Sequence, residues 1–399
     1  MAERSLFILG RQASIGIAEL ESVYGSDAIK VVSPQCATCD IQASEIDFGR
    51  LGSSIKLGSY LGSLPTARWQ EVKERLVGFA LRCAKDIPDG KVQFGFSVYD
   101  FPVSSQQLMA TGLSIKKQLR NHGYSARLVP NKEEALSSAQ VLHNNLVGQR
   151  GIELLVVRNG SRTIIGRTEV IQDIAAYSAR DHARPKRDAF VGMLPPKLAQ
   201  TIVNLATAQA PTREEHIILD PFCGTGVILQ EALLMGYGAY GSDLEARMIE
   251  YSKKNLEWLA NRESVAEPML ETGDATTYRW RHAFSTVASE TYLGRPLSSW
   301  PAPDRLTSII GSCDIIISKF LRNLGRQTPV NTRFCLAVPV WINPNNGSVK
   351  HLPMLDHLSV LGYNRVSFQQ VSANDLIYYR PGQLVGRELL VLTKSKESS

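Results

Sequence analysis

The feature that most constrains the fold is the alternation of apolar runs and helical patterns that begins at His216 and continues toward the C-terminus. Apolar runs of strand length predict seven strands, at 216–219, 239–242, 268–272, 285–288, 334–338, 365–370 and 388–392. Parallel strands need long crossover connections, which helices usually supply. The alternation therefore predicts an α/β fold with a seven-stranded, doubly wound, mostly parallel sheet, closed by an antiparallel hairpin and covered by a helix at 195–208.

The first of these strands runs into a glycine-rich turn. The run His216-Ile-Ile-Leu-Asp220-Pro-Phe-Cys-Gly224-Thr-Gly226 joins a buried strand, a carboxylate and a tight turn to a helix predicted at 227–235. Glycines here let a ligand approach the backbone closely, and the helix N-terminus favours a ligand at the carboxyl edge of the sheet. The GxGxxG spacing of a nicotinamide dinucleotide site is absent from this run.

Three carboxylates follow three consecutive predicted strands. Asp220 is suited to a cationic or hydroxyl-bearing group, Asp243 to ribose hydroxyls, and Asp274 to an adenine amino group. Taken alone, each acid is more often a cap or turn residue, but three acids at one sheet edge predict a pocket for an adenosine-bearing cofactor. The residues predicted to bind it are Asp220, Phe222, Gly224, Gly226, Asp243, Leu244, Asp274 and Ala275.

The N-terminal half predicts further α/β modules. Residues 1–100 form one module, with strands at 5–10, 29–32 and 92–98 and helices at 14–24 and 69–84. Residues 101–170 form a second, basic module, in which a helix through residue 120 precedes a strand at 126–129, a helix at 132–146 and strands at 153–158 and 162–168. A linker at 171–192 then leads to the domain at 193–399.

Positive charge gathers between residues 116 and 187, where thirteen Lys and Arg stand against six Asp and Glu. An isolated basic run is usually a solvated face, but beside a ligand-binding domain it favours contact with phosphates. For Arg180 and Arg184 the alternative is an interdomain ion pair, and for Lys197 a solvated helix start. The residues predicted to bind RNA are Lys116, Lys117, Arg120, Arg127, Arg180, Arg184, Lys186 and Lys197.

Two resemblances follow from these motifs. The run at 220–226 is similar to the first cofactor motif of class I methyltransferases, which implies S-adenosylmethionine as the cofactor. Over nearly the whole chain, the sequence resembles the THUMP-domain tRNA guanosine N2-methyltransferases of the guanine-10 type, which implies that 101–170 is a THUMP-like module that binds tRNA. The motifs that carry this second resemblance are Phe7-Ile-Leu-Gly-Arg11, Ile17-Ala-Glu-Leu20, Arg180-Asp-His-Ala-Arg184-Pro185, Met193-Leu-Pro-Pro-Lys197-Leu-Ala199, Tyr379-Arg-Pro381 and Val385-Gly-Arg387-Glu388.

The segment after the fourth strand is the candidate substrate site. Enzymes that methylate an exocyclic amino group usually carry Asp, Asn or Ser, then Pro-Pro and Tyr or Phe, at this place. This chain has Ser289-Glu290-Thr291-Tyr292 instead. Ser289 stands at the acceptor position and Tyr292 at the stacking position, whereas Glu290 is either a polar acceptor or a surface acid. The predicted catalytic residues are Ser289, Glu290 and Tyr292.

Together with the cofactor motif, the second resemblance implies transfer of a methyl group to the exocyclic N2 of a guanosine in tRNA. An adenine N6-methyltransferase acting on RNA or DNA is the alternative within the same chemistry. A non-catalytic tRNA-binding protein with a relic cofactor site is the alternative outside it, since both prolines are missing. The resemblance admits a small activator subunit as a further partner, and we favour a monomer.

The composition of the chain indicates the cellular compartment in which it is expected. No run of about 18 uncharged apolar residues is present and no secretory signal is recognised, so no membrane association is expected. Six cysteines in 399 residues make no disulfide framework, which favours the cytoplasm. Cys36 and Cys39 form a CxxC without a second ligand pair, so no metal site is predicted.

Overall fold

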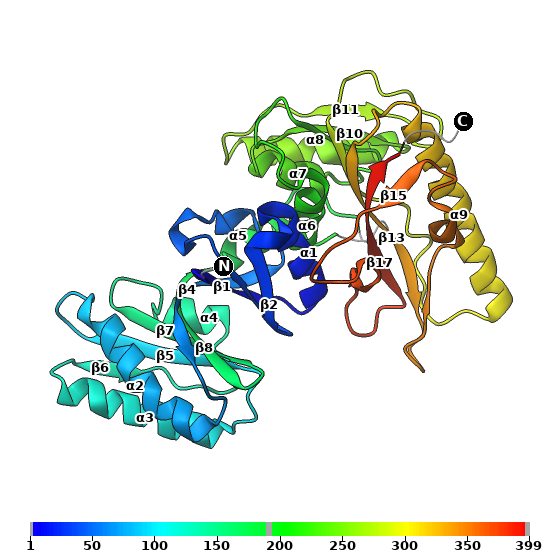
Figure 1. The fold of residues 1–399 in the computed structure, drawn as a ribbon. Helices are drawn as coiled ribbons and strands as arrows, with labels where there is room; N and C mark the ends of the chain where they lie inside the picture. The colour runs from blue at the N-terminus through cyan, green and yellow to red at the C-terminus, as the bar shows by residue number, and fades with distance from the viewer. Residues whose placement is uncertain (1–2, 189–193, 396–399) are drawn as a thin grey trace. The chain divides into compact units, whose positions relative to one another are not determined.

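The structure is a computed structural model that describes residues 3–188 and 194–395. The chain divides into two compact units (Figure 1). The first unit comprises Met1–Ala13, Ser26–Gly49 and Ser54–Ile174, and the second comprises Ser14–Gly25, Arg50–Ser53 and Ala175–Ser399. We expected a boundary near residue 100, but the first unit continues through it, and the predicted helix near the N-terminus belongs to the second unit.

The first unit is built on an eight-stranded sheet with the order β2-β3-β1-β4-β8-β7-β5-β6. β5 runs parallel to β6 and β7, and the other neighbours are antiparallel. The strands are β1 (Ser5–Leu9), β2 (Ile29–Ser33), β3 (Cys36–Cys39), β4 (Ser54–Leu64), β5 (Val92–Tyr99), β6 (Ala126–Leu128), β7 (Gly151–Asn159) and β8 (Arg162–Ile171). The single sheet explains why no boundary falls near residue 100, because β5 lies between β6 and β7.

Both faces of this sheet are packed. Along β7, Ile152 and Leu154 join the core under two helices that lie side by side, α2 and α3, while Leu155 and Val157 join a cluster on the other face (Figure 1). Successive side chains of a strand point to opposite faces of the sheet, so this alternation is expected for a strand that is buried on both faces. The helices are α2 (Trp69–Lys85), α3 (Ser105–Asn121) and α4 (Ser138–His143).

Helix α4 is shorter than the helix predicted at 132–146. Ser137 and Gln140 form a capping box, in which the Gln140 N–H donates to Ser137 Oγ at 3.3 Å and the Ser137 N–H to Gln140 Oε1 at 3.0 Å. Because this box satisfies the first N–H groups of a helix, the helix begins at Ser138. Asn145, with a φ of 53°, follows its end.

A buried ion pair lies inside the first unit. Lys56 Nζ contacts the carboxylate of Glu153 and donates to Leu136 O at 2.8 Å and to Ser97 Oγ at 3.2 Å. Glu153 also accepts from the hydroxyls of Ser97 at 2.5 Å and Thr168 at 2.7 Å. Burial lowers the pKa of Lys56, and the charge of Glu153 opposes that shift. Every ammonium proton and both carboxylate oxygens therefore have partners.

The second unit contains the predicted α/β sheet, with the order β11-β10-β9-β12-β13-β17-β15. Strands β9 to β13 are parallel, and β17 runs antiparallel between β13 and β15. Two short strands, β14 and β16, extend the sheet to nine. The strands are β9 (Ile217–Asp220), β10 (Gly238–Asp243), β11 (Met269–Thr272), β12 (Thr286–Glu290), β13 (Arg333–Ile342), β14 (Val349–Lys350), β15 (Tyr363–Arg365), β16 (Ile377–Tyr378) and β17 (Val385–Lys394).

The expected doubly wound sheet is thus confirmed, but its sixth strand was placed wrongly. We predicted a strand at 365–370, whereas β15 ends at Arg365. The carboxylate of Glu21 instead accepts the backbone N–H groups of Gln369 at 2.8 Å and Gln370 at 2.7 Å. A buried acid from a distant helix therefore satisfies the backbone groups that a strand would have used in a ladder.

Helices cover both faces of the second sheet. Leu389 and Val391 of β17 pack in the core with α6 and α7, and Leu390 and Leu392 pack in the core with α9. The helix near the N-terminus, α1, adds Ile15 and Ala18 to the first of these cores. No helix within the described residues is long and apolar enough to cross a membrane. The helices are α1 (Ala13–Tyr24), α5 (Ile174–His182), α6 (Pro196–Thr207), α7 (Val227–Leu234), α8 (Ala246–Ala260) and α9 (Pro303–Gly325).

Candidate active site

A cavity of about 640 Å³ opens at the carboxyl ends of β9 to β12. Parallel strands bring their carboxyl ends to one edge of a sheet, so the residues that follow successive strands meet there. Two predicted residues, Gly226 and Ser289, do not line the cavity. Those that do are Asp220, Phe222, Gly224, Asp243, Leu244, Asp274, Ala275, Glu290 and Tyr292.

The glycine turn between β9 and α7 has a backbone that only glycine adopts readily. Gly224 has a φ of 50° and Gly226 a φ of 81°, both in the left-handed region. Space is also short, because a Cβ on Gly226 would lie 3.0 Å from Ser252 Oγ. Ser252 Oγ donates to Gly224 O at 2.8 Å, and Asn255 Nδ2 donates to Thr225 O at 2.9 Å. Helix α8 therefore holds the turn from behind.

Asp243 ties this turn to the second strand. Its Oδ2 accepts the Gly224 N–H and its Oδ1 the Glu245 N–H, both at 2.9 Å. Burial raises the pKa of Asp243, and these two backbone donors oppose that shift. Asp274 is held similarly, since its Oδ1 accepts from the backbone N–H of Thr276 at 2.9 Å. Both carboxylates therefore face the cavity in orientations that the backbone fixes.

Asp220 lies deeper than the other two acids. Its Oδ1 accepts the hydroxyl proton of Ser289 at 2.6 Å and the Phe222 N–H at 3.2 Å. Burial raises the pKa of Asp220 to about 8, and the nearby acids Asp243 and Glu290 add to that shift. The carboxyl group is therefore largely protonated at neutral pH, although it lines a cavity suited to a cation.

The segment at 289–292 differs from the prediction at its first residue. Ser289 is fully buried and turned toward Asp220, so it does not face the cavity as an acceptor for a substrate amine. Glu290 lines the cavity, and one carboxylate oxygen accepts a hydrogen bond from Arg387 Nε. The interpretation of Glu290 as a surface acid is therefore wrong. Tyr292 is 39% exposed at the cavity wall, where a ring is available for stacking.

Sequence reasoning missed the role of Arg387 in this site. Arg387 is 6% exposed and lies on β17, where it and Glu388 precede the apolar run 389–392. Buried arginines need a partner, so a charge inside such a strand was the available signal. The adjacent Glu388 points to the opposite face of the sheet, where it pairs with Arg365 at 2.9 Å and with His351 at 2.6 Å.

The residues predicted to bind RNA fall into two groups. Within the first unit, Lys117, Arg120 and Arg127 are exposed and Lys116 is half-buried, with three of them on α3. These four side chains are accessible to a phosphate backbone.

In the second unit, the prediction is wrong for Arg184. This residue is 4% exposed, and its Nη1 lies 3.5 Å from Thr225 Oγ1 in the glycine turn. Arg180 pairs with the buried Glu231 at 3.0 Å. Lys186 is half-buried, as is Lys197, whose ammonium lies 5.0 Å from the ring centroid of Tyr177. Met193 of the quoted motif and part of the expected linker, 189–192, lie outside the described residues.

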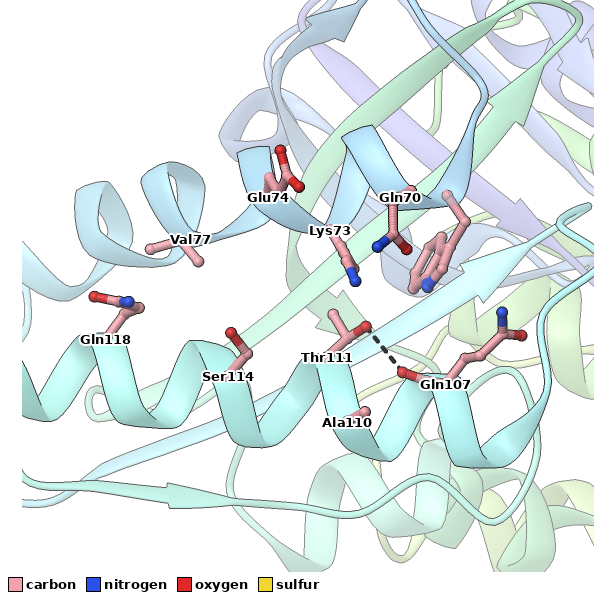
Figure 2. Close-up of a pocket in the computed structure, with 10 residues that line it drawn as sticks. Gln70, Lys73, Glu74, Val77, Gln107, Ala110, Thr111, Ser114 and Gln118 are labelled. Atoms are coloured by element: carbon pink, nitrogen blue, oxygen red, sulfur yellow. Dashed lines mark hydrogen bonds between the residues drawn. The ribbon is translucent and has the colours of Figure 1, made fainter.

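A second cavity, of about 400 Å³, lies in the first unit between α2 and α3. Figure 2 shows Gln70 and Lys73 from α2 facing Gln107 and Thr111 from α3 across it. Thr111 Oγ1 donates to the backbone carbonyl of Gln107 at 2.9 Å, within its own helix. The described lining includes none of the residues predicted to bind RNA, and Glu74 is the one carboxylate in it, so this groove has no cluster of acids.

The second unit resembles known methyltransferases in sequence. Residues 184–313 match the family model of an RMKL-like methyltransferase domain. A tRNA (guanine(10)-N2)-dimethyltransferase from Methanothermobacter thermautotrophicus is 42% identical over 102 residues, which are 26% of this chain and 29% of that protein. Its counterpart from Pyrococcus abyssi is 47% identical over 83 residues, 21% of this chain and 22% of that protein. The matches span less than a third of these relatives.

Solved structures resemble the chain over its whole length. TrmN from Thermus thermophilus aligns with a TM-score of 0.52 at 16% identity and covers 98% of this chain and 100% of its own. A possible methylase from Clostridium difficile 630 aligns with a TM-score of 0.53 at 13% identity, and the alignment covers 100% of this chain and 99% of that protein. At such identities the likeness concerns the fold alone. Together with the strand order, it confirms the class I methyltransferase fold.

Proposed function

We propose that the chain is an S-adenosylmethionine-dependent methyltransferase that acts on the exocyclic N2 of a guanosine in tRNA. The observation that carries the proposal is the single cavity that joins the glycine turn, three strand-end acids and the wall formed by Glu290 and Tyr292. One half of the cavity suits an adenosine-bearing donor and the other half suits a base. The matched methyltransferase domain and the two tRNA methyltransferase relatives support the same chemistry.

The residues at the turn fit the proposed cofactor. Gly224 lines the cavity and leaves its backbone open to a ligand, and Asp243 and Asp274 offer acceptors for ribose and adenine. Arg184 supplies a further indication, because its buried Nε and Nη2 have no hydrogen-bond partner among the described residues. Such unsatisfied donors cost about 1–3 kcal/mol each, so the carboxylate of the cofactor is a favourable partner there, beside the N-terminus of α7.

The protein itself has to orient the methyl donor and the base relative to each other. When bound, the cofactor supplies a methyl group on a sulfonium that is already activated. Asp243 and Asp274 would hold the cofactor, which would supply the methyl for the guanine N2, and the N2 proton would pass by way of the acceptor Glu290 to solvent. Tyr292 would stack on the base and Glu290 would accept from its amino group, which holds the nitrogen on line with the methyl carbon.

The proposed nucleic-acid surface lies on the first unit. Lys117, Arg120 and Arg127 are exposed there, and phosphate contacts of this kind provide most of the non-specific affinity for RNA. We assign residues 101–170 as a THUMP-like tRNA-binding module within this unit, and a tRNA substrate would place the protein in the cytoplasm. The Lys117→Gln variant should bind tRNA a few-fold more weakly and with a shallower salt dependence, whereas Lys253→Gln in the second unit serves as a charge-matched control.

The test combines binding with product analysis. The full chain should bind S-adenosylmethionine in calorimetry, and Asp243→Ala should weaken the affinity about 100-fold because it removes charged acceptors and loosens the turn. Incubation with radiolabelled cofactor and unmodified tRNA transcripts should yield N2-methylguanosine after digestion. No heat on cofactor addition would end the proposal. Binding of both ligands without transfer would favour the relic cofactor site, and N6-methyladenosine would favour the adenine alternative.

A further inference from the structure

We propose that Arg387, by pairing with Glu290, makes Glu290 an obligate hydrogen-bond acceptor that selects guanine over adenine at the mouth of the cavity. Glu290 would touch the base, and Arg387 is a positioning residue that acts through Glu290. This inference rests on the proposed function and deepens it, since the exocyclic amino group alone does not distinguish the two purines.

The geometry sets one carboxylate oxygen apart from the other. Arg387 Nε donates to Oε1 of Glu290, and the pair is nearly buried, with side-chain exposures of 7% for Arg387 and 14% for Glu290. Glu290 nevertheless lines the cavity, two residues before the exposed ring of Tyr292. The carboxylate is therefore anchored on the side of β17 and presented on the side of the cavity, next to the residue proposed to stack on the base.

The chemistry of the two bases explains the selection. Guanine presents two adjacent donors, its N1–H and its N2 amino group, and an ionised carboxylate is an acceptor only. Adenine presents an amino donor beside the N1 lone pair, so an ionised carboxylate would meet that lone pair without a proton between them. A protonated carboxyl or an amide offers one donor and one acceptor, which instead matches adenine. The charge of Glu290 thus determines which base is accepted.

Arg387 favours the charged form of Glu290. Burial raises the pKa of Glu290, and the charge and hydrogen bond of Arg387 oppose this. The other titratable groups around the cavity are Asp220 on β9, which is largely protonated at neutral pH, and the lining residues Asp243, Glu245, Asp274, Arg295 and Lys319. Arg387 is the cation in contact with Glu290, so its removal should let the carboxylate take up a proton.

The first experiment exchanges the acceptor for an amide. The wild-type chain and the Glu290→Gln variant receive radiolabelled cofactor and unmodified tRNA, and the digested nucleosides are separated. Wild type should prefer guanine over adenine by at least about 100-fold, and Glu290→Gln should reduce that preference by at least about tenfold. Glu290→Gln with wild-type selectivity would overturn the inference while leaving the methyltransferase proposal intact. A wild type that neither binds cofactor nor transfers methyl would instead remove the proposed function.

The second experiment decides the matter where Glu290→Gln is inactive on both bases. The pH dependence of kcat/KM on tRNA is measured for wild type, Arg387→Met and Arg387→Lys. Without Arg387 the pKa of Glu290 rises, so the rising limb of the Met variant should move to higher pH and the Lys variant should restore it. Arg365→Met, which removes a partner of the neighbouring buried Glu388, is the matched control and should leave the limb in place. An unmoved limb in Arg387→Met contradicts the inference.

Discussion

The two units each bury an ion pair inside a sheet, but the pairs have different surroundings. In the first unit, Lys56 and Glu153 are surrounded by further donors and acceptors from Ser97, Leu136 and Thr168. In the second unit, Arg387 and Glu290 contact each other at the edge of a cavity. The first pair is closed, since its hydrogen-bonding capacity is used within the protein, whereas the second pair presents a carboxylate to a space that a ligand can enter.

This difference separates a structural charge from a functional one. A fully satisfied buried pair has nothing left to offer a ligand, and removal of one partner leaves an uncompensated charge in the core. Breaking a pair at a cavity edge lowers the stability of the protein less, because the cavity admits water and a proton can neutralise the acid. Burial alone would have ranked Lys56 and Glu153 above Glu290 as a candidate site, although both side chains are fully buried and satisfied by their neighbours.

Breaking the closed pair should have the largest effect on stability. We expect Lys56→Met to lower the free energy of unfolding by about 3–5 kcal/mol, because Glu153 would remain buried without its cation. Chemical denaturation of the full chain, followed by a probe in the first unit, measures the change. The double variant Lys56→Met/Glu153→Leu should recover much of the loss, since no buried charge then remains. A single variant as stable as wild type would contradict the closed network.

Breaking the open pair should cost less. Arg387→Met leaves Glu290 next to the cavity, where it can be hydrated or protonated, so we expect a loss of about 2 kcal/mol in the free energy of unfolding. The same denaturation experiment, with a probe in the second unit, gives the value. A loss equal to or greater than that of Lys56→Met would show that the second pair is also structural and would remove the contrast between the two.

The cavity side of the open pair can be tested through Tyr292. Replacement of this half-exposed ring by Ala should lower kcat/KM on tRNA about tenfold, within the 1–3 kcal/mol that stacking of a base provides. Affinity for the cofactor and the stability of the protein should stay the same. Tyr292→Phe is the matched control and should retain activity. Full activity in Tyr292→Ala would refute the stacking role and would show that no base binds against this wall of the cavity.

Local patterns in the sequence predicted the cavity better than they predicted its chemistry. The strand, turn and helix at 216–235 and the acids at the strand ends are consecutive or periodic signals, and the structure brings Asp220, Asp243 and Asp274 to one sheet edge as expected. Ser289 was misjudged because its inward direction depends on Asp220, 69 residues away. Arg387 was missed because its partner lies 97 residues away, on a different strand.

The elements of the fold that we misplaced also depend on contacts between residues that are distant in the sequence. The strand predicted at 365–370 has the right composition, yet Glu21 takes the backbone N–H groups of Gln369 and Gln370. Likewise, α1 follows its helical pattern correctly, but no local signal assigns it to the second unit, where Glu19 accepts the N–H groups of Gly52 and Ser53 at 2.9 Å each. Buried carboxylates that bind distant backbone are long-range contacts, which periodicity does not report.

The change of cofactor affinity with pH gives the smallest predicted effect and tests the role of Asp220 in the cavity. The pKa of Asp220 is raised by burial to about 8, so the folded protein keeps a proton that the unfolded chain releases near pH 4. Relative to Asp220→Asn, wild-type stability should therefore fall as pH rises from about 4 to 8 and then level off. Cofactor affinity should move the opposite way, because the ionised carboxylate attracts a cationic ligand. Calorimetry between pH 7 and 9 should show that the affinity of the wild type for the cofactor rises about fivefold relative to that of Asp220→Asn. The Asn side chain stays neutral over this range, and any titration of the ligand affects both proteins equally. A constant ratio would mean that Asp220 is a closed group like Glu153, held by Ser289 and Phe222 and without influence on what enters the cavity.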